Sequence, residues 1–319
     1  MRRTLSAMEF TRAHGTANDF VVLPDLDDGL ELTAELARAL ADRRRGLGGD
    51  GVIRVAAPPQ TQPDAQVFMD HRNADGSLAE MCGNGIRVLA KYVVDRGLVA
   101  SDDEGRVHVA TRGGIRTVWI VERHADGRVA SVAVDMGPPQ LDASQVPFVA
   151  ADPTARRHRV ELDGAAAAAV DADHLDVAVV SMGNPHAVVS VASVADAPVA
   201  EVGPAIERHH RFPNGANIGF VEVVDHATLR LRVFERGVGE TAACGTGACA
   251  AVVAAQLTGA VGERVAVHLP GGVLTIEHRD GGTVMMTGPA VEIAHGRLDE
   301  GWLADLAVGA RPLTSWRAS

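Results

Sequence analysis

The sequence predicts an α/β protein of two similar halves, each a curled mixed β-sheet around a central α-helix, with the active site in the cleft between them. Three observations support this prediction. Short runs rich in valine and isoleucine recur throughout the chain, as in a protein made mainly of strands. Helical patterns are few, and two of them are deeply apolar. Several motifs also occur twice in the same order, which indicates an internal repeat.

Composition narrows the class of protein and its partners. With 319 residues, 46% hydrophobic and 22% charged, the chain has the composition of a globular protein with a sizeable core. A net charge of −11 gives no long-range attraction for phosphate backbones or anionic lipids, so nucleic acid and membranes are not expected partners. Three cysteines fit a reducing compartment, and no apolar stretch follows Arg2 and Arg3. We therefore expect no secretory signal and a cytoplasmic protein.

The expected strands are short and many are bounded by turn-forming residues. They lie at 20–23, 51–55, 107–111, 116–121, 129–134, 177–181, 188–191, 218–223, 228–234, 264–268, 273–278 and 283–287. Helical patterns lie at 33–44, 85–96 and 247–257. The first opens on the capping residue Thr33 and has Leu36 and Leu40 on one face. The third is apolar all round, which is typical of a helix buried inside a fold.

The repeat is clearest where the second and third helices begin. Cys82-Gly83-Asn84-Gly85 precedes one helix, and Cys244-Gly245-Thr246-Gly247 precedes the other, 162 residues later. Upstream, the sequence of residues 15–22 is weakly similar to that of residues 183–189, which begin 168 residues later. The similar segments 51–53 and 219–221 are separated by the same distance along the chain. We therefore expect a first half at 1–134, a second at 135–294, and a C-terminal segment at 295–319 that returns to the first half.

A cysteine directly before a helix suits proton transfer. The thiol lies near the positive end of the helix dipole, which stabilises the thiolate and lowers its pKa. Glycines beside it leave backbone N–H groups free to bind an anion. If two such helix starts face each other, a carboxylate held there places its α-carbon between two sulfurs. One thiolate then removes the α-proton while the other thiol donates one to the opposite face, as in a two-base racemase or epimerase.

Together, these motifs resemble diaminopimelate epimerases. The two signatures are 72–77 with Cys82-Gly83-Asn84-Gly85-Ile86-Arg87, and 235–241 with Cys244-Gly245-Thr246-Gly247-Ala248-Cys249-Ala250. Further blocks at 14–20, 182–186, 217–220, 269–272 and 286–288 follow in the family order. The resemblance covers about residues 8–296. It implies interconversion of LL- and meso-diaminopimelate, without pyridoxal phosphate or metal, in bacterial lysine and peptidoglycan-precursor synthesis.

The resemblance also implies roles for individual residues. Cys82 and Cys244 would be the base and acid pair. The reacting carboxylate would be held by Gly83 and Asn84 at one helix start and by Gly245 and Thr246 at the other. The amino and carboxylate groups of this small-molecule substrate would be bound by Asn18, Asn73, Asn184, Asn217, Glu235 and Arg236. His186 and Glu235 are expected close enough to the sulfurs to bias their protonation. No cofactor and no metal is expected.

The resemblance also bears on the oligomeric state, and at one position this chain differs from the family pattern. The resemblance implies a homodimer and closure of the two halves around the substrate, which would exclude water. Where many members carry a glutamine after a Gly-x-Gly-x-Asp turn, this chain has Gly51, so one side-chain contact to the substrate is missing. The segment from Glu300 to Ser319 extends beyond the family core and has no assigned function.

Several alternatives compete with these assignments. Each cysteine could be a small buried hydrophobic residue, and that interpretation is kept for Cys249, which lies inside the apolar helix. A zinc site using both catalytic candidates and His186 lacks the usual ligand spacing. His14, His71, His124, His209 and His210 are expected on the surface or in loops.

Two other functions remain open. A proline racemase relative would have the same two-half architecture, but Gly-His typically follows its first cysteine, and this chain has Asn84. The charged pair Glu235-Arg236, suited to a distal charged group, also argues against it. A binding protein for an anionic amino acid could keep the cleft without catalysis, although pure binding needs no sulfur.

Overall fold

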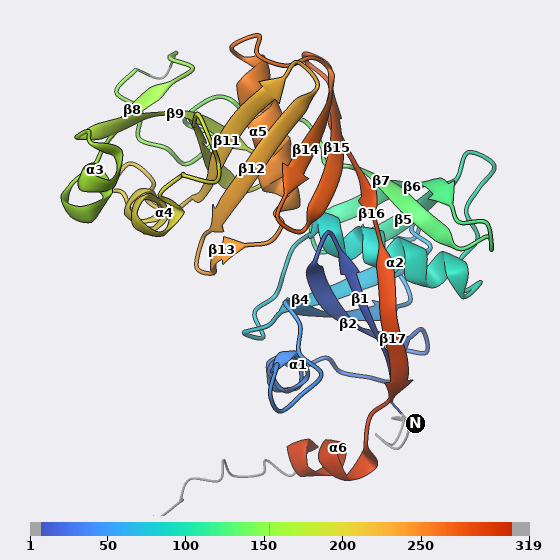
Figure 1. Ribbon diagram of the computed structural model, residues 1–319. Helices are drawn as coiled ribbons and strands as arrows, with labels where there is room; N and C mark the ends of the chain where they lie inside the picture. Colours follow the sequence, from blue (N-terminus) through green and yellow to red (C-terminus); the bar gives the residue numbers. More distant parts are fainter. Residues whose placement is uncertain (1–7, 153, 308–319) are drawn as a thin grey trace, which may run out of the picture.

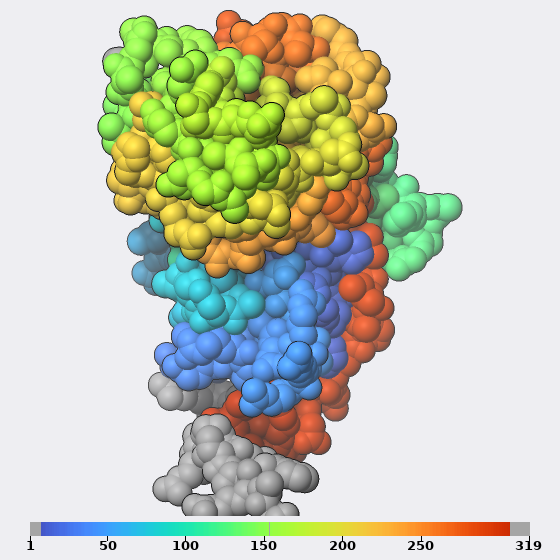
Figure 2. Space-filling view, turned by 60° about the vertical axis from the view of Figure 1, so that its left-hand side comes forward, coloured from blue at the N-terminus to red at the C-terminus, as the bar shows by residue number. Residues whose placement is uncertain are grey.

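The computed structural model describes residues 8–152 and 154–307 of the chain. Two helices, α2 (Gly83–Asp95) and α5 (Gly245–Gln256), form the centres of two groups of strands. In Figure 1 the strands around α5 form the upper part of the molecule and those around α2 lie below them. The space-filling view shows the second half of the chain stacked on the first, with α6 (Glu300–Ala307) at the lower end (Figure 2).

The first half is a curled mixed sheet. Its strands are β1 (Glu9–Gly15), β2 (Asn18–Asp25), β3 (Gly51–Ala56), β4 (Val67–Asn73), β5 (Arg106–Thr111), β6 (Gly114–Arg123) and β7 (Val129–Asp135). Neighbours pair in chain order, with β2–β3 and β4–β5 parallel and the other pairs antiparallel. Helix α1 (Ala34–Ala41) contacts β2, β3 and β4, and its apolar face packs with α6 in a small separate core.

The second half repeats this arrangement. It contains β8 (His158–Glu161), α3 (Gly164–Val170), β9 (His174–Ser181), β10 (Pro185–Ser190), α4 (Val199–Glu207), β11 (Asn217–Asp225), β12 (Thr228–Glu235), β13 (Gly239–Thr241), β14 (Arg264–Leu269), β15 (Gly272–His278) and β16 (Val284–Pro289). The pairs β10–β11 and β12–β14 are parallel, as β2–β3 and β4–β5 are in the first half. The prediction of two similar halves, each around one helix, is confirmed.

The halves are closed by outer strands from different parts of the chain. In the second half, β8 pairs with β9, which follows it directly. In the first half the equivalent position beside β1 is taken by β17 (Val291–Arg297), near the other end of the chain. A pairing between β7 and β16 joins the two sheets, and one hydrophobic core runs across both α2 and α5.

All twelve expected strands overlap observed ones, but five others were missed: β1, β4, β8, β13 and β17. Their sequences mix charged or polar residues with apolar ones, as in Val67–Asn73, where Asp70 and His71 are nevertheless buried. Three short helices, α3, α4 and α6, were also missed. The predicted boundaries after residues 134 and 294 fall inside β7 and β17, and the division they define stays a prediction. Among the described residues, no helix is long and apolar enough to cross a membrane.

Candidate active site

Helix α2 begins with a cysteine as its N-cap. Cys82 has an extended backbone, with φ −136° and ψ 117°, and its Sγ accepts a hydrogen bond from the N–H of Gly85 at 3.4 Å. The sulfur therefore takes the position that a serine or aspartate oxygen usually holds at a helix start. Because the cysteine serves as the cap, the helix begins at Gly83, two residues before the expected start. Cys82 is partly exposed and carries a free thiol.

Helix α5 begins in the same way. Cys244 has φ −125° and ψ 113°, and its Sγ accepts the N–H of Gly247 at 3.4 Å. The same sulfur lies 3.5 Å from the hydroxyl oxygen of Thr246. Cys244 is buried, with 5% of its surface exposed, and it too is a free thiol. The two cysteines are thus geometric equivalents, as the sequence repeat predicts. Cys249 lies inside the same helix and is fully buried, which confirms its expected place in the core.

The two helix starts lie close together. An ideal Cβ on Gly83 would be 2.5 Å from Cε of Met286, and one on Gly245 would be 3.0 Å from its Sδ, so the same methionine packs against both glycines. Asn84 spans the gap between the halves. Its Nδ2 donates to Oδ1 of Asn18 at 3.2 Å and to the carbonyl of Ala243, directly before Cys244, at 3.5 Å. Its buried Oδ1 has no partner among the described residues and can accept a donor from a ligand.

Residues of the first half hold the Cys82 side of the site. Oδ1 of Asn18 lies 3.8 Å from Sγ of Cys82, and its Nδ2 donates to Asp50 at 2.8 Å. Asn73 is exposed at the end of β4, where its Nδ2 donates to the hydroxyl of Ser77 at 2.9 Å. Asn18 is therefore in contact with the cysteine, whereas Asn73 lies further out on the same sheet.

Residues at the ends of β10, β11 and β12 lie on the Cys244 side. Glu235 accepts a hydrogen bond from the hydroxyl of Thr241 at 2.6 Å, and its carboxylate raises the pKa of Cys244. Its neighbour Arg236 donates through its backbone N–H to Oδ1 of Asn217 at 3.0 Å, and its guanidinium donates to the carbonyl of Asn214 at 2.8 Å. Glu235 therefore acts electrostatically on Cys244, and Arg236 is hydrogen-bonded to Asn217.

His186 is the register partner of Asn217 in the parallel pair β10–β11. Its Nε2 lies 3.0 Å from Oδ1 of Asn184, and its buried Nδ1 has no partner in the described part of the chain. Burial lowers the pKa of this histidine to about 3, so the ring is neutral. The ring is hydrogen-bonded to Asn184, and the predicted influence of His186 on the sulfurs stays a prediction.

Burial shifts the pKa values of both cysteines in the direction opposite to the prediction. It raises the pKa of Cys82, although the N–H groups of Gly85 and Asn84 act to lower it. The pKa of Cys244 is raised further, first by burial and then by the carboxylate of Glu235. The prediction that the helix starts lower both pKa values is therefore wrong in its net direction, because loss of hydration outweighs the helix N–H groups. Burial also raises the pKa of Glu235.

At Gly51 there is no room for a side chain, because His71 occupies the adjacent space. An ideal Cβ on Gly51 would be 2.6 Å from Nε2 of His71 and 2.9 Å from the carbonyl oxygen of Arg72. His71 is 3% exposed and packs edge-on against Phe20, so its expected place on the surface is wrong. Neither ring nitrogen has a partner among the described residues. Sequence patterns missed this residue because a histidine in a polar-ended strand gives no signal of burial.

The buried His71 should make stability depend on pH. Burial lowers its pKa from 6.5 to about 4. Between these values the unfolded chain binds a proton that the folded chain does not, so stability falls as the pH falls. His71→Leu should remove about 1.5 kcal/mol of the stability difference between pH 6.5 and pH 5. Urea unfolding at both pH values measures it. His124→Leu, at an exposed position, is the control, and equal pH dependence in His71→Leu and the parent would contradict the expectation.

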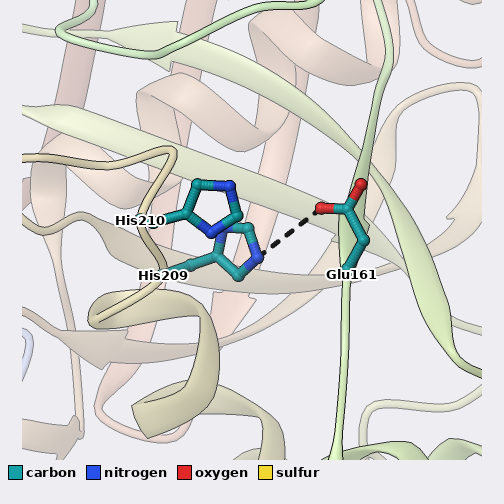
Figure 3. A group of neighbouring side chains, drawn as sticks. All are labelled: Glu161, His209 and His210. Carbon is teal, nitrogen blue, oxygen red and sulfur yellow. Dashed lines mark ion pairs between the residues drawn. The ribbon is translucent and has the colours of Figure 1, made fainter.

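One other group of side chains has the spacing of metal ligands. The ligand atoms of Glu161, His209 and His210 lie within 4.8 Å of one another, on β8 and after α4 (Figure 3). The atoms of Glu161 and His209 already have partners: Nε2 of His209 lies 3.6 Å from the Glu161 carboxylate, and its Nδ1 accepts the N–H of Arg211 at 3.3 Å. The Arg211 guanidinium also lies 3.3 Å from Glu161. A cation would have to displace these contacts beside a permanent positive charge, so the group is best described as a surface ion-pair cluster.

Comparison with known proteins identifies the class of fold. A solved structure of a probable proline racemase from Agrobacterium radiobacter K84 matches with a TM-score of 0.65 at 16% identity, over 92% of this chain and 93% of that one. A hydroxyproline epimerase from Agrobacterium vitis matches with a TM-score of 0.63 at 14% identity, over 93% of this chain and 94% of that one. The chain thus has the two-half fold of these enzymes.

Sequence comparison identifies the family. The family model described as diaminopimelate epimerase matches residues 10–141 and 178–293. The diaminopimelate epimerase of Halorhodospira halophila is 46% identical over 297 residues, 92% of this chain and 95% of that protein. That of Acidovorax ebreus is 45% identical over 300 residues, 92% of this chain and 98% of that protein. The chain belongs to the diaminopimelate epimerase family.

Proposed function

We propose that this protein interconverts LL- and meso-2,6-diaminopimelate in bacterial lysine and peptidoglycan-precursor biosynthesis. Family membership supports the reaction. The observation that carries the chemistry is the matched pair of cysteine N-caps, Cys82 and Cys244, whose helix starts are connected through Asn84. A small-molecule substrate, a homodimer and a cytoplasmic location belong to the same proposal.

The two sulfurs act as base and acid on one carbon atom. In one direction, a thiolate removes the α-proton and the electron pair moves into the adjacent carboxylate. The thiol of the other cysteine then donates its proton to the opposite face of the α-carbon, which inverts the centre. The thiolate has become a thiol and the thiol a thiolate, so the reverse reaction uses the pair in exchanged roles. No electron is gained or lost, and the chemistry requires no cofactor.

The helix starts bind the anion that this reaction creates. The first N–H groups of each helix, at Gly83 and Asn84 and at Gly245 and Thr246, hold the reacting carboxylate where negative charge develops. Met286 packs against both glycines, and an added Cβ at either position would require its side chain to shift. Burial raises the pKa of both cysteines, so the mechanism includes a step in which one thiol loses its proton within the site. Glu235, whose carboxylate acts on Cys244, is the proton acceptor that we assign to that step.

The remaining residues select a substrate with two amino acid centres. Diaminopimelate carries an ammonium and a carboxylate at each end, so its site needs donors and acceptors in similar numbers. The predicted set is Asn18, Asn73, Asn184, Asn217, Glu235 and Arg236. Arg236 supplies a guanidinium that can bind a carboxylate through two parallel hydrogen bonds. The free Oδ1 of Asn84 supplies an acceptor for an ammonium group at the reacting centre.

The direct test is NMR of enantiopure LL-diaminopimelate in heavy water with the reduced protein. Deuterium should appear at one α-carbon as the meso isomer forms, because the hydrogen that each inversion delivers comes from the solvent, which here is heavy water. L-proline serves as the comparison substrate, since the fold is shared with a probable proline racemase. Exchange on proline with none on diaminopimelate would overturn the proposal. Tight binding of diaminopimelate without exchange would instead indicate a binding protein.

A further inference from the structure

Arg87 is the largest fully buried side chain of the described residues, and no carboxylate lies beside it there. Its guanidinium donates to the hydroxyl of Thr16 at 2.8 Å and to the carbonyls of Gly83 at 3.2 Å and Pro289 at 3.4 Å. It also lies 3.7 Å from the sulfur of Met286. Every one of these partners is uncharged, so a full positive charge is buried without an anion.

Two other cations with little solvent exposure, Lys91 and Arg54, are paired. Lys91, one turn further along α2, donates to Asp95 at 2.7 Å, and both side chains are buried. Arg54 contacts the carboxylates of Asp25 and Asp70 at 2.8 and 2.9 Å. Burying a charge without a counter-ion is costly, and replacing such a group by an apolar one is often neutral or stabilising. Because Arg87 has no counter-ion among the described residues, we look for its anion among the groups that become charged during turnover.

The guanidinium lies directly behind the two helix starts. Its contact with the Gly83 carbonyl places it against the first turn of α2. Its contact with Met286 places it behind the methionine that packs against both Gly83 and Gly245. One layer of side chain thus separates the charge from the place where the proposed mechanism forms a thiolate and holds a carboxylate. In a buried site a unit charge is poorly screened and acts on the ionisation of nearby groups.

We infer that Arg87 is a positioning residue whose buried charge stabilises the anionic form of Cys82 during turnover without touching the substrate. The inference rests on the proposed function, because the anion it serves is the thiolate of the two-base mechanism. Arg87 stays protonated at neutral pH, since burial lowers its pKa only to about 10.

The charged groups around Cys82 are consistent with stabilisation of its thiolate by Arg87. After burial and the helix N–H groups, Glu235 from β12 raises the pKa of Cys82 and Arg87 lowers it. On the α5 side, Arg87 faces Cys249, whose pKa burial raises to about 12, so that thiol stays neutral. Further along α2, Lys91 and Asp95 neutralise each other. Arg87 is thus the cation that opposes Glu235 at Cys82.

The test measures the ionisation of Cys82 without any substrate. The rate of carboxamidomethylation of Cys82 by iodoacetamide is followed against pH by mass spectrometry of its peptide, because only the thiolate reacts. Arg87→Gln keeps hydrogen-bond donors for Thr16 and Gly83 but removes the charge. It should raise the midpoint by about one pH unit, which is a tenfold slower reaction at neutral pH. Arg87→Met, which removes the charge and the hydrogen-bond donors together, should give the same shift.

Lys91→Met is the matched control, since it removes a buried positive charge from the same helix and should leave the midpoint unchanged. Thermal unfolding of each variant separates electrostatics from packing. The inference requires the shift in Arg87→Gln whatever happens to its stability. An unchanged midpoint in Arg87→Gln, or an equal shift in Lys91→Met, would overturn it. Because the assay contains no diaminopimelate, an incorrect substrate assignment would leave this result unaffected, and the NMR experiment would report that failure separately.

Discussion

Removing either thiol, in Cys82→Ala or Cys244→Ala, should reduce epimerisation of LL-diaminopimelate by about a thousandfold or more. A positioned general acid or base contributes about 10²- to 10⁴-fold, and each substitution removes a group needed in both directions of the reaction. The two losses should be similar, because the cysteines have matching cap geometry. Formation of the meso isomer and deuterium incorporation in heavy water measure the effect.

Cys249→Ala is the matched control for these substitutions. Cys249 lies on the same helix as Cys244, is fully buried in the core and is assigned no catalytic role. Its replacement should lower stability modestly, as loss of a small buried side chain does, and leave turnover near the parent value. Turnover retained in Cys82→Ala would refute the two-base mechanism even if diaminopimelate proved to be the substrate.

The second large effect is expected at the contact between the halves. Gly271 lies between β14 and β15, and its N–H donates to the carbonyl of Ala242 at 2.8 Å. An ideal Cβ there would be 2.2 Å from the carbonyl oxygen of Thr16 and 3.0 Å from that of Ala242. Both are backbone atoms, so neither can swing away. Gly271→Ala should therefore lower the free energy of unfolding by about 3 kcal/mol, at the upper end for overpacking.

The turn that Gly271 contacts has little freedom to adjust. Thr16 and Ala17 already have φ values of 56° and 62°, which non-glycine residues seldom adopt. The next residue is Asn18, which contacts Cys82, so activity should fall together with stability in Gly271→Ala. Urea unfolding and the epimerisation assay measure the two effects.

Gly113→Ala is the control for this substitution. An ideal Cβ on Gly113 has its nearest neighbour at 3.6 Å, an ordinary contact, and its φ lies outside the left-handed region. Its effect on the free energy of unfolding should stay within about 0.5 kcal/mol. Equal stability of the two variants would show that the halves separate at this contact more readily than the structure indicates.

The sequence predicts the centre of the site well because its signals are local. A Cys-Gly-x-Gly motif before an apolar helix specifies a cap, a close backbone approach and a buried axis, and all three are present at Cys82 and Cys244. The repeat predicts the two-half fold for the same reason, since equivalent strands have similar patterns. Even the two-residue error at each helix start has a local cause, because the sulfur itself is the cap.

Features that depend on three-dimensional packing could not be predicted in this way. The raised pKa values of the cysteines follow from burial, which a motif does not report. The burial of His71 beside Gly51 depends on pairing between β3 and β4. Arg87 belongs to a recognised signature, yet only the structure shows that its charge is buried without a carboxylate.

The positions of the two outer strands, β8 and β17, along the chain determine which half can be completed first during synthesis. All strands that surround α5 lie between β8 and β16, so the second half is complete once residue 289 has left the ribosome. The first half begins to emerge much earlier, but the edge of β1 stays open until β17, residues 291–297, is available. The half that is translated first should therefore be the last to close. Until then an unpaired strand edge is exposed, and this is the stage at which a chaperone would protect the chain from aggregation.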